Sequence, residues 1–223
     1  MSINPAAQRI ISRYKKLAPH NRPTFLRAPL PYNDRRCVSG LISWATTELD
    51  EPFLNQLLKD AQKANDTERT QRILGRMFEQ RRHMTDQHSA FFFRWAAGSS
   101  FDVNAACTRV IGETNLLWID RLLPYVDDAS VRTKAYEEIV LHCEFHRNRY
   151  VVEGDHRDFD EDVYINLLMR HLKKEPYADA LKTLAHLHTI DPVVAAVGAR
   201  MEGERLRQEI AHDPIATQSR RKL

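Results

Sequence analysis

The amino-acid sequence predicts an all-α fold, a bundle of about nine or ten helices. Glycine is scarce, at 7 of 223 residues, so the chain lacks the turn residues that a many-stranded sheet requires. Apolar residues recur at helical spacing along most of the length. Helix-capping residues and prolines stand between these periodic segments. Together, these three observations favour helix throughout the folded part of the chain.

The predicted helices follow one another closely. Asp50 is placed to cap a helix that has Pro52 in its first turn, and Asn65 with Glu68 has the spacing of a capping box. The segment 113–123 is apolar on nearly every side, so we expect it to be central and buried. Further helices are predicted over residues 5–17, 38–47, 65–97, 102–112 and 127–151.

For the C-terminal part of the chain, the sequence predicts a helical hairpin over residues 161–174 and 177–189. A further helix is predicted over residues 192–212. Pro176 separates the first two segments, and Asp191 is a cap followed by Pro192 at the first helical position. Residues 160–194 resemble a single tetratricopeptide-type hairpin at Tyr164, Leu167, Ala180, Leu184 and Pro192. They depart from that motif at His171, Leu168 and Leu187, and no second copy adjoins. The prediction is therefore a helical hairpin and no more.

Three regions are expected along the chain. Residues 1–36 form a basic N-terminal helix followed by an extended arm, broken by Pro19, Pro23, Pro29 and Pro31. Residues 37–212 form the helical domain. Residues 213–223 form a flexible basic tail.

Composition narrows the class of protein. Hydrophobic residues make up 43% and charged residues 28%, which is typical of a globular chain. The longest apolar runs are far shorter than the roughly 18 residues that a membrane span requires, and the first residues lack the apolar core of a secretory signal. The cysteines, Cys37, Cys107 and Cys143, are odd in number and lack CxxC spacing. We expect no membrane span, no disulfide framework and a cytoplasmic location.

Charge is distributed unevenly. Residues 1–36 hold eight basic side chains against one acidic one, a net charge of +7, whereas the rest of the chain carries −4. Such an arm could bind the phosphates of a nucleic acid, or an acidic protein surface of its own or of a partner. The candidate binding residues are Arg9, Arg13, Lys15, Lys16, Arg22, Arg27, Arg35 and Arg36.

A second candidate is the aromatic run Phe91, Phe92, Phe93 and Trp95. Three successive phenylalanines sweep roughly 200° of a helix, which is wider than the stripe that a surface helix buries. We interpret this run as a helix end enclosed in the core. The alternative is an exposed patch that binds a partner.

The third candidate is a line of titratable residues, Glu138, His142 and His146, spaced four apart on a predicted helix. Two histidines at this spacing can chelate a metal. However, the Glu-x-x-His and HExxH patterns of helical metal sites are absent. We therefore interpret the histidines as hydrogen-bonded residues at a core boundary, and we expect neither a metal nor another cofactor.

These observations predict a non-enzymatic helical protein-interaction factor: an adaptor, an accessory subunit or a chaperone-like component of a larger assembly. The sequence contains no Gly-rich phosphate loop and no nucleophile motif. Two alternatives stay open. One is a nucleic-acid-associated protein that uses the basic arm, and the other is a metal-dependent helical enzyme built around His142 and His146.

Overall fold

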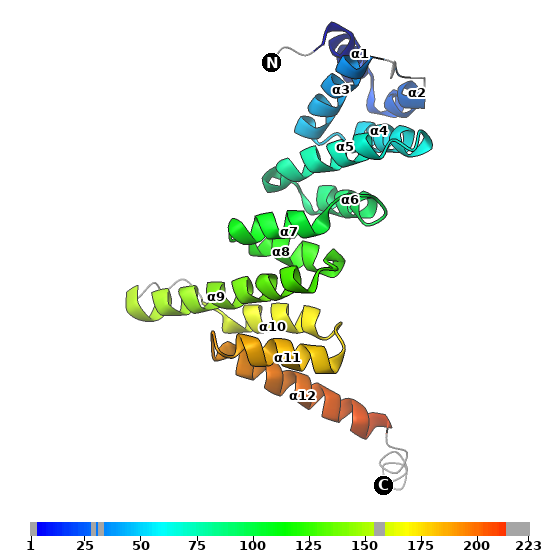
Figure 1. Ribbon diagram of the computed structural model, residues 1–223. Helices are drawn as coiled ribbons and strands as arrows, with labels where there is room; N and C mark the ends of the chain where they lie inside the picture. The colour runs from blue at the N-terminus through cyan, green and yellow to red at the C-terminus, as the bar shows by residue number, and fades with distance from the viewer. Residues whose placement is uncertain (1–3, 28–29, 31–33, 154–158, 213–223) are drawn as a thin grey trace. The chain divides into compact units, whose positions relative to one another are not determined.

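The computed structural model describes residues 4–27, 30, 34–153 and 159–212, and within them it confirms the all-α fold. These residues form twelve α-helices and three short 3-10 helices, and they contain no strand. Figure 1 labels the helices along the chain. The chain divides into two compact units, Met1–Asp102 and Val103–Leu223. The boundaries expected after residues 36 and 212 stay predictions, and the predicted tail 213–223 lies outside the described residues.

Unit 1 is a stack of helices in which each helix packs on the next helix in the sequence or on the one after it. α1 and α2 pack on α3 and α4, respectively, α3 contacts α4 and α5, and α5 contacts α4 and α6. The helices are α1 (Pro5–Lys16), α2 (Arg22–Arg27), α3 (Arg35–Glu48), α4 (Glu51–Lys63), α5 (Thr67–Glu79) and α6 (Asp86–Ala96), with 3-10 turns at Pro19–Asn21 and Arg81–His83.

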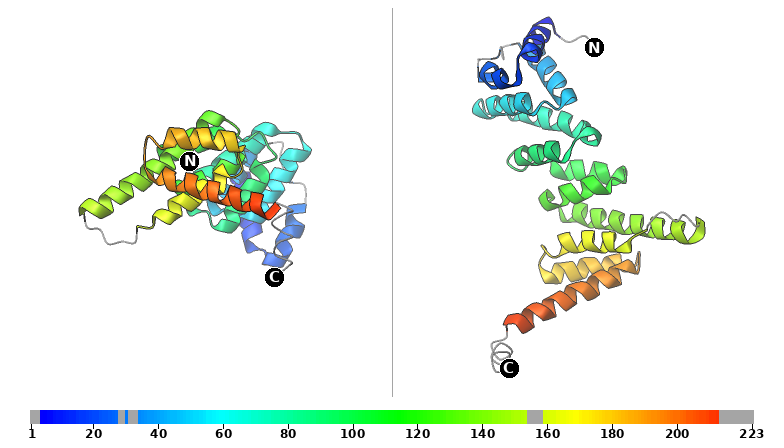
Figure 2. Two further views of the ribbon diagram at one scale, coloured as in Figure 1. Left: turned by 90° about the horizontal axis from the view of Figure 1, so that it is seen from below. Right: turned by 180° about the vertical axis from the view of Figure 1, so that it is seen from behind.

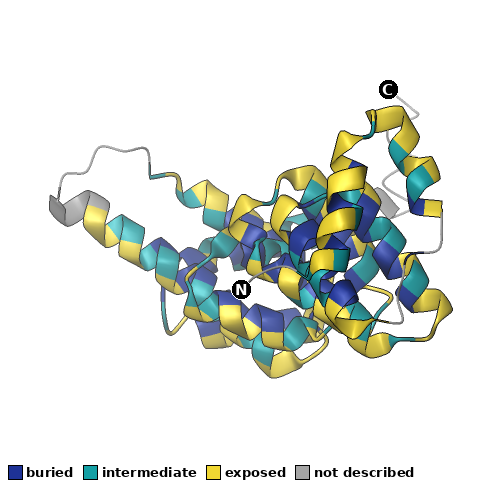
Figure 3. Cartoon of the chain, turned by 90° about the horizontal axis from the view of Figure 1, so that it is seen from above, coloured by how far each residue is buried: buried dark blue, intermediate teal, exposed yellow. Residues whose placement is uncertain are grey.

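Most helices of the chain carry both buried and exposed residues, whereas α3 is exposed only at its ends (Figure 3). In α1, Ala7, Ile11 and Tyr14 follow at helical spacing and are buried, while the opposite side is exposed. Burying such apolar stripes removes hydrocarbon from water, which is the main favourable term in folding. The helices therefore stack because of the periodicity that the sequence displays.

Two connectors in unit 1 and one in unit 2 share the same construction. Leu49, Asn65 and Thr114 adopt left-handed backbone conformations, with φ of 50°, 52° and 53°. The next residue in each case makes two hydrogen bonds. Its backbone N–H donates to the carbonyl five residues earlier, and its side chain accepts a backbone N–H from the first turn of the following helix. The N–H bonds are Asp50 to Ala45 (3.1 Å), Asp66 to Ala61 (2.9 Å) and Asn115 to Val110 (3.1 Å), and the side chains accept from Phe53, Arg69 and Trp118. One residue thus closes a helix and caps the next.

Unit 2 is also a stack of helices. α9 packs against α7, α10 and α11, α7 contacts α8, and α12 contacts both α10 and α11. One end of α9 extends beyond the helices that pack on it (Figure 2), and Leu141 and Phe145 lie exposed on this helix. The helices are α7 (Val103–Gly112), α8 (Leu116–Leu122), α9 (Ala129–Glu153), α10 (Glu161–Leu172), α11 (Tyr177–Leu187) and α12 (Val193–His212), with a 3-10 turn at Leu123–Tyr125.

A polar contact joins α9 to the start of α12. Asp191 is 1% exposed, pairs with the Arg147 guanidinium at 2.6 Å and accepts the Val193 backbone N–H at 2.7 Å. A buried carboxylate is stable when charge and hydrogen bonds compensate it, and both are present here. The predicted cap at Asp191 therefore also anchors a neighbouring helix.

The predicted count of nine or ten helices is too low, because one predicted helix is two. The segment 65–97 breaks between Glu79 and Asp86, where the Arg81 side chain donates to the Phe78 carbonyl at 3.1 Å. Thr85 then starts α6 through a capping box with His88, a helix start that was not predicted from the sequence. The cap of α5 is Asp66, since the predicted cap Asn65 occupies the left-handed position before it.

The second additional helix lies in the segment 19–36, which was expected to be extended. Residues 22–27 form α2, in which Leu26 is buried. Pro19 and Pro23 stand in the first turns of their helical segments, where a backbone N–H has no intrahelical partner, so they are compatible with helix. Residues 28–29 and 31–33 lie outside the described residues.

The segment 113–123 is less buried than predicted. Its helix, α8, begins at Leu116, and Leu117 is 57% exposed. Trp118, Ile119 and Leu122 form the buried face. An apolar residue on the outer side of a helix is tolerated singly, so composition alone overestimated the burial of this segment.

The left-handed connectors lead to a stability prediction. Thr114 is exposed and β-branched, and a β-branched residue is strained at positive φ. We expect Thr114→Gly to stabilise α7 and α8 by about 0.5–1 kcal/mol, measured by amide hydrogen exchange in the native state. Asn65→Gly is the matched control and should gain less, because Asn tolerates this conformation. A loss of protection in the Thr114 variant would contradict the assignment.

Candidate functional site

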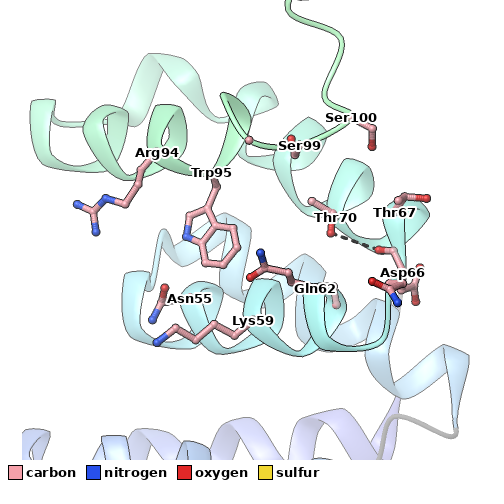
Figure 4. A pocket seen from close by; sticks show the side chains of 13 residues that line it. Asn55, Lys59, Gln62, Asp66, Thr67, Thr70, Arg94, Trp95, Ser99 and Ser100 are labelled. Atoms are coloured by element: carbon pink, nitrogen blue, oxygen red, sulfur yellow. Dashed lines mark hydrogen bonds between the residues drawn. The ribbon is translucent and has the colours of Figure 1, made fainter.

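A groove lies in unit 1, along α4, α5 and α6. It has a volume of about 670 Å³ and is lined by one face of α4, the first turns of α5, the end of α6 and the loop 98–100 (Figure 4). This volume falls within the range of roughly 300–1,000 Å³ that is typical of ligand pockets. The groove is therefore the candidate functional site.

The α4 side of the groove is set by helical periodicity. Asn55, Lys59 and Gln62 follow at spacings of four and three residues, so they share one face of the helix. The buried stripe of the same helix comprises Phe53, Leu54, Leu57, Leu58 and Ala61. Packing of this stripe in the stack leaves the polar face at the groove.

The opposite wall comes from the end of α6, where aromatic packing holds the helix in place. Phe92 is fully buried, with ring centroids 5.1 Å from Phe93, 5.2 Å from Phe101 and 6.2 Å from Phe78. Trp95, three residues after Phe92, is half-buried, and its indole extends across the groove towards α4 (Figure 4). The core aromatics thus position an aromatic surface that a ligand can reach.

The groove carries positive charge at one end. Lys59 and Arg94 are both exposed and lie at the same end of the groove, on opposite walls (Figure 4). Neither side chain forms an ion pair with another residue in the described part of the chain. Asp66 is the one carboxylate among the lining residues, and it is engaged with the Arg69 backbone N–H (2.9 Å) and guanidinium (3.0 Å).

The other end is lined by hydroxyl groups on a fixed loop. The Ser99 hydroxyl donates to the Ala96 carbonyl and accepts the Phe101 backbone N–H, at 3.1 and 3.2 Å. Gln71 donates to the Ser100 carbonyl at 2.9 Å. These bonds hold the loop against α5 and α6, and Thr67 and Thr70 complete this end.

The basic N-terminal candidates do not reach this groove. Arg9, Arg13 and Lys16 are exposed on α1 at spacings of four and three residues, opposite its buried face. Lys15 pairs with Glu48 at 3.0 Å, and the Arg22 guanidinium lies 5.0 Å from the centre of the Tyr14 ring. The other three candidates are also exposed. They lie at the end of α2 (Arg27) and at the start of α3 (Arg35 and Arg36).

The aromatic run is divided by the structure. Phe91, Phe92 and Phe93 are buried, so they lie in the core of unit 1. Trp95 is half-buried and is the member of the run that lines the groove.

The predicted titratable line lies on α9 in unit 2. The His142 and His146 rings are 4.4 Å apart, and His142 Nδ1 lies 3.1 Å from the Tyr164 hydroxyl. Glu138 is half-buried on the same helix. Among the described residues, no group of three or more His, Cys, Asp or Glu side chains is arranged to hold a metal ion.

The three cysteine thiols are free and buried. Burial raises the pKa of Cys107 and that of Cys143 to about 11 in each case, and it also raises the pKa of Cys37. A thiol with a raised pKa stays protonated at neutral pH and is a poor nucleophile.

Asn55, Lys59, Gln62 and Arg94 were not among the residues predicted from the sequence. Their residue types and spacing are those of any solvated helix face, so no local pattern distinguishes them. Trp95 was identified, as part of the aromatic run. What brings the set together is the packing of α4, α5 and α6.

These features define an all-α protein of two compact helical units, the first of which carries a positively charged groove. Comparison with protein-family models, curated proteins and solved structures finds no match for this chain. Within the described residues, no helix has the length and apolar character needed to cross a bilayer.

The paired histidines predict a pH response. Burial, followed by the charge of nearby His146, lowers the pKa of His142 below its ordinary value of 6.5. The unfolded chain therefore binds more protons than the folded chain just below pH 6.5, and this group makes stability fall as the pH drops through that window. We expect NMR titration to place the pKa of His142 below 6.5 and His146→Gln to raise it. A value at or above 6.5 in the unsubstituted chain would contradict the packing described.

Proposed function

We propose that this chain is a helical protein-interaction factor, an adaptor, accessory subunit or chaperone-like component, that holds a segment of a partner protein in the unit 1 groove. The observation that supports this is the groove itself, in which amides, hydroxyls, two cations and an indole line one open surface. Such groups can bind a peptide backbone and its side chains at several points.

The lining chemistry favours binding over catalysis. The thirteen lining residues include neither His nor Cys. Their one carboxylate, Asp66, serves as a helix cap and as the partner of Arg69. A carboxylate that acts as a general acid or base must be able to reach a substrate, and this one is already engaged.

Site-specific photo-cross-linking tests the proposal. We expect a photoreactive phenylalanine analogue at Gln62, which is exposed in the groove, to yield discrete protein adducts in nuclease-treated extract of the source cells. The same analogue at Arg76, exposed on α5 outside the groove lining, is the control. Equal labelling from both positions, or none from Gln62, would contradict the proposal.

A second candidate function is binding of nucleic acid by α1. Arg9, Arg13 and Lys16 form an exposed cationic stripe, and none has an ion-pair partner in the described part of the chain. The aromatic residue of this helix, Tyr14, is buried and donates its hydroxyl to Asp50 at 2.9 Å, so it is not available to stack on bases. The stripe alone therefore supports this candidate, through phosphate contacts.

Salt dependence separates the two functions. If the stripe binds phosphates, replacing Arg9, Arg13 and Lys16 by Ala should flatten the log–log salt slope for random duplex DNA by about 3 units, with Lys63→Ala as control. If the chain instead binds a partner protein, we expect weak DNA binding at physiological ionic strength. The three substitutions should then have little effect on that binding. Submicromolar binding at about 150 mM salt that is lost in the triple variant would favour the second candidate.

A further inference from the structure

We propose that the segment held in the unit 1 groove is acidic, with a carboxylate seated between Lys59 and Arg94 and an adjacent apolar side chain packed against Trp95. This inference rests on the proposed function and specifies the chemistry of the partner. It follows from the cations, the indole and the position of Asp66.

The two cations have no counter-ion within the described part of the chain, whereas several other basic residues of unit 1 are paired. In the same unit, Lys15 pairs with Glu48, Arg69 with Asp66 and Arg72 with Glu68. Lys59 and Arg94 have no such partner in the part of the chain that the structure describes, yet they come from different helices to the same end of one groove (Figure 4). A carboxylate of a partner protein would supply a counter-ion to both side chains. The planar guanidinium of Arg94 can form two parallel hydrogen bonds to such a carboxylate.

Charge alone would bind such a segment weakly, because exposed ion pairs contribute little. Trp95 adds an apolar contact to the ion pair. Its indole is half-buried beside the cations and offers a flat apolar surface that a neighbouring side chain can cover. Covering it removes water from both apolar groups and from the ion pair, which strengthens the electrostatic contact.

The groove favours a peptide over a nucleic acid because its charge is confined to one end. A phosphate backbone is negative along its whole length, and it would bring charge towards Asp66 at the far end of the groove (Figure 4). A peptide can place one carboxylate at the cations and continue as a neutral chain. Gln62, Thr67 and Thr70 can then hydrogen-bond its backbone.

Selection from a library of short random peptides tests this inference. We expect the intact chain to enrich peptides that pair Asp or Glu with a neighbouring apolar residue. The double variant Lys59→Glu/Arg94→Glu should enrich Lys or Arg in that place, and its affinity for the acidic peptides should fall at least about tenfold. Both side chains are exposed, so the reversal is compatible with folding, which amide NMR spectra check.

Two further variants sharpen the selection. Trp95→Ala should remove the preference for the apolar neighbour and keep that for the acidic residue. Lys63→Glu, exposed on the same helix but outside the groove lining, should leave the selection unchanged.

Enrichment without an excess of acidic residues, no enrichment, or a charge reversal without effect would each overturn the inference. These results are distinguishable from failure of the proposed function. If neutral peptides compete with cross-linking at Gln62, the groove binds a partner but has no preference for acidic segments. Loss of the Gln62 adducts themselves would instead remove the proposed function.

Discussion

The architecture depends on helix connectors in which one residue both ends a helix and caps the next. Asp50 and Asp66 close α3 and α4 through their backbone N–H groups and start α4 and α5 through their carboxylates. Because these connectors are so short, successive helices must stack directly on one another. The second connector also lies at the groove, where Asn65, Asp66 and Thr67 form part of the lining. The geometry of the candidate site is thus a consequence of how α4 ends.

Aromatic packing determines what the site presents. Phe92 fills the space between Phe78 and Phe101 and so fixes the rotation of α6. That rotation buries three consecutive phenylalanines and leaves Trp95 at the groove. Stability and the proposed binding therefore depend on the same short run of residues: the phenylalanines supply the apolar burial, and the tryptophan supplies the accessible surface.

The sequence predicted most helices because apolar periodicity and capping residues are local signals, as at Asp50 and Asp191. It failed where local signals compete: Pro19 and Pro23 indicated an extended arm but stand in helical first turns, and the cap at Thr85 was hidden inside a periodic segment. Scarce glycine did not prevent tight connectors, because Leu49 and Thr114 adopt the left-handed conformation themselves. That Lys59 and Arg94 line the same groove could not be predicted in this way, since it depends on the packing of helices separated in the sequence.

The central claim is that the unit 1 groove binds an acidic peptide at Lys59, Arg94 and Trp95. Its most direct test is the set of indole N–H signals in an NMR spectrum of the full chain during titration with a selected acidic peptide. The signal of Trp95, identified from its absence in Trp95→Phe, should shift with the peptide. The signals of Trp44 and Trp118, which are buried in units 1 and 2, should stay in place. An unmoved Trp95 signal, or a shift confined to Trp118, would contradict the account.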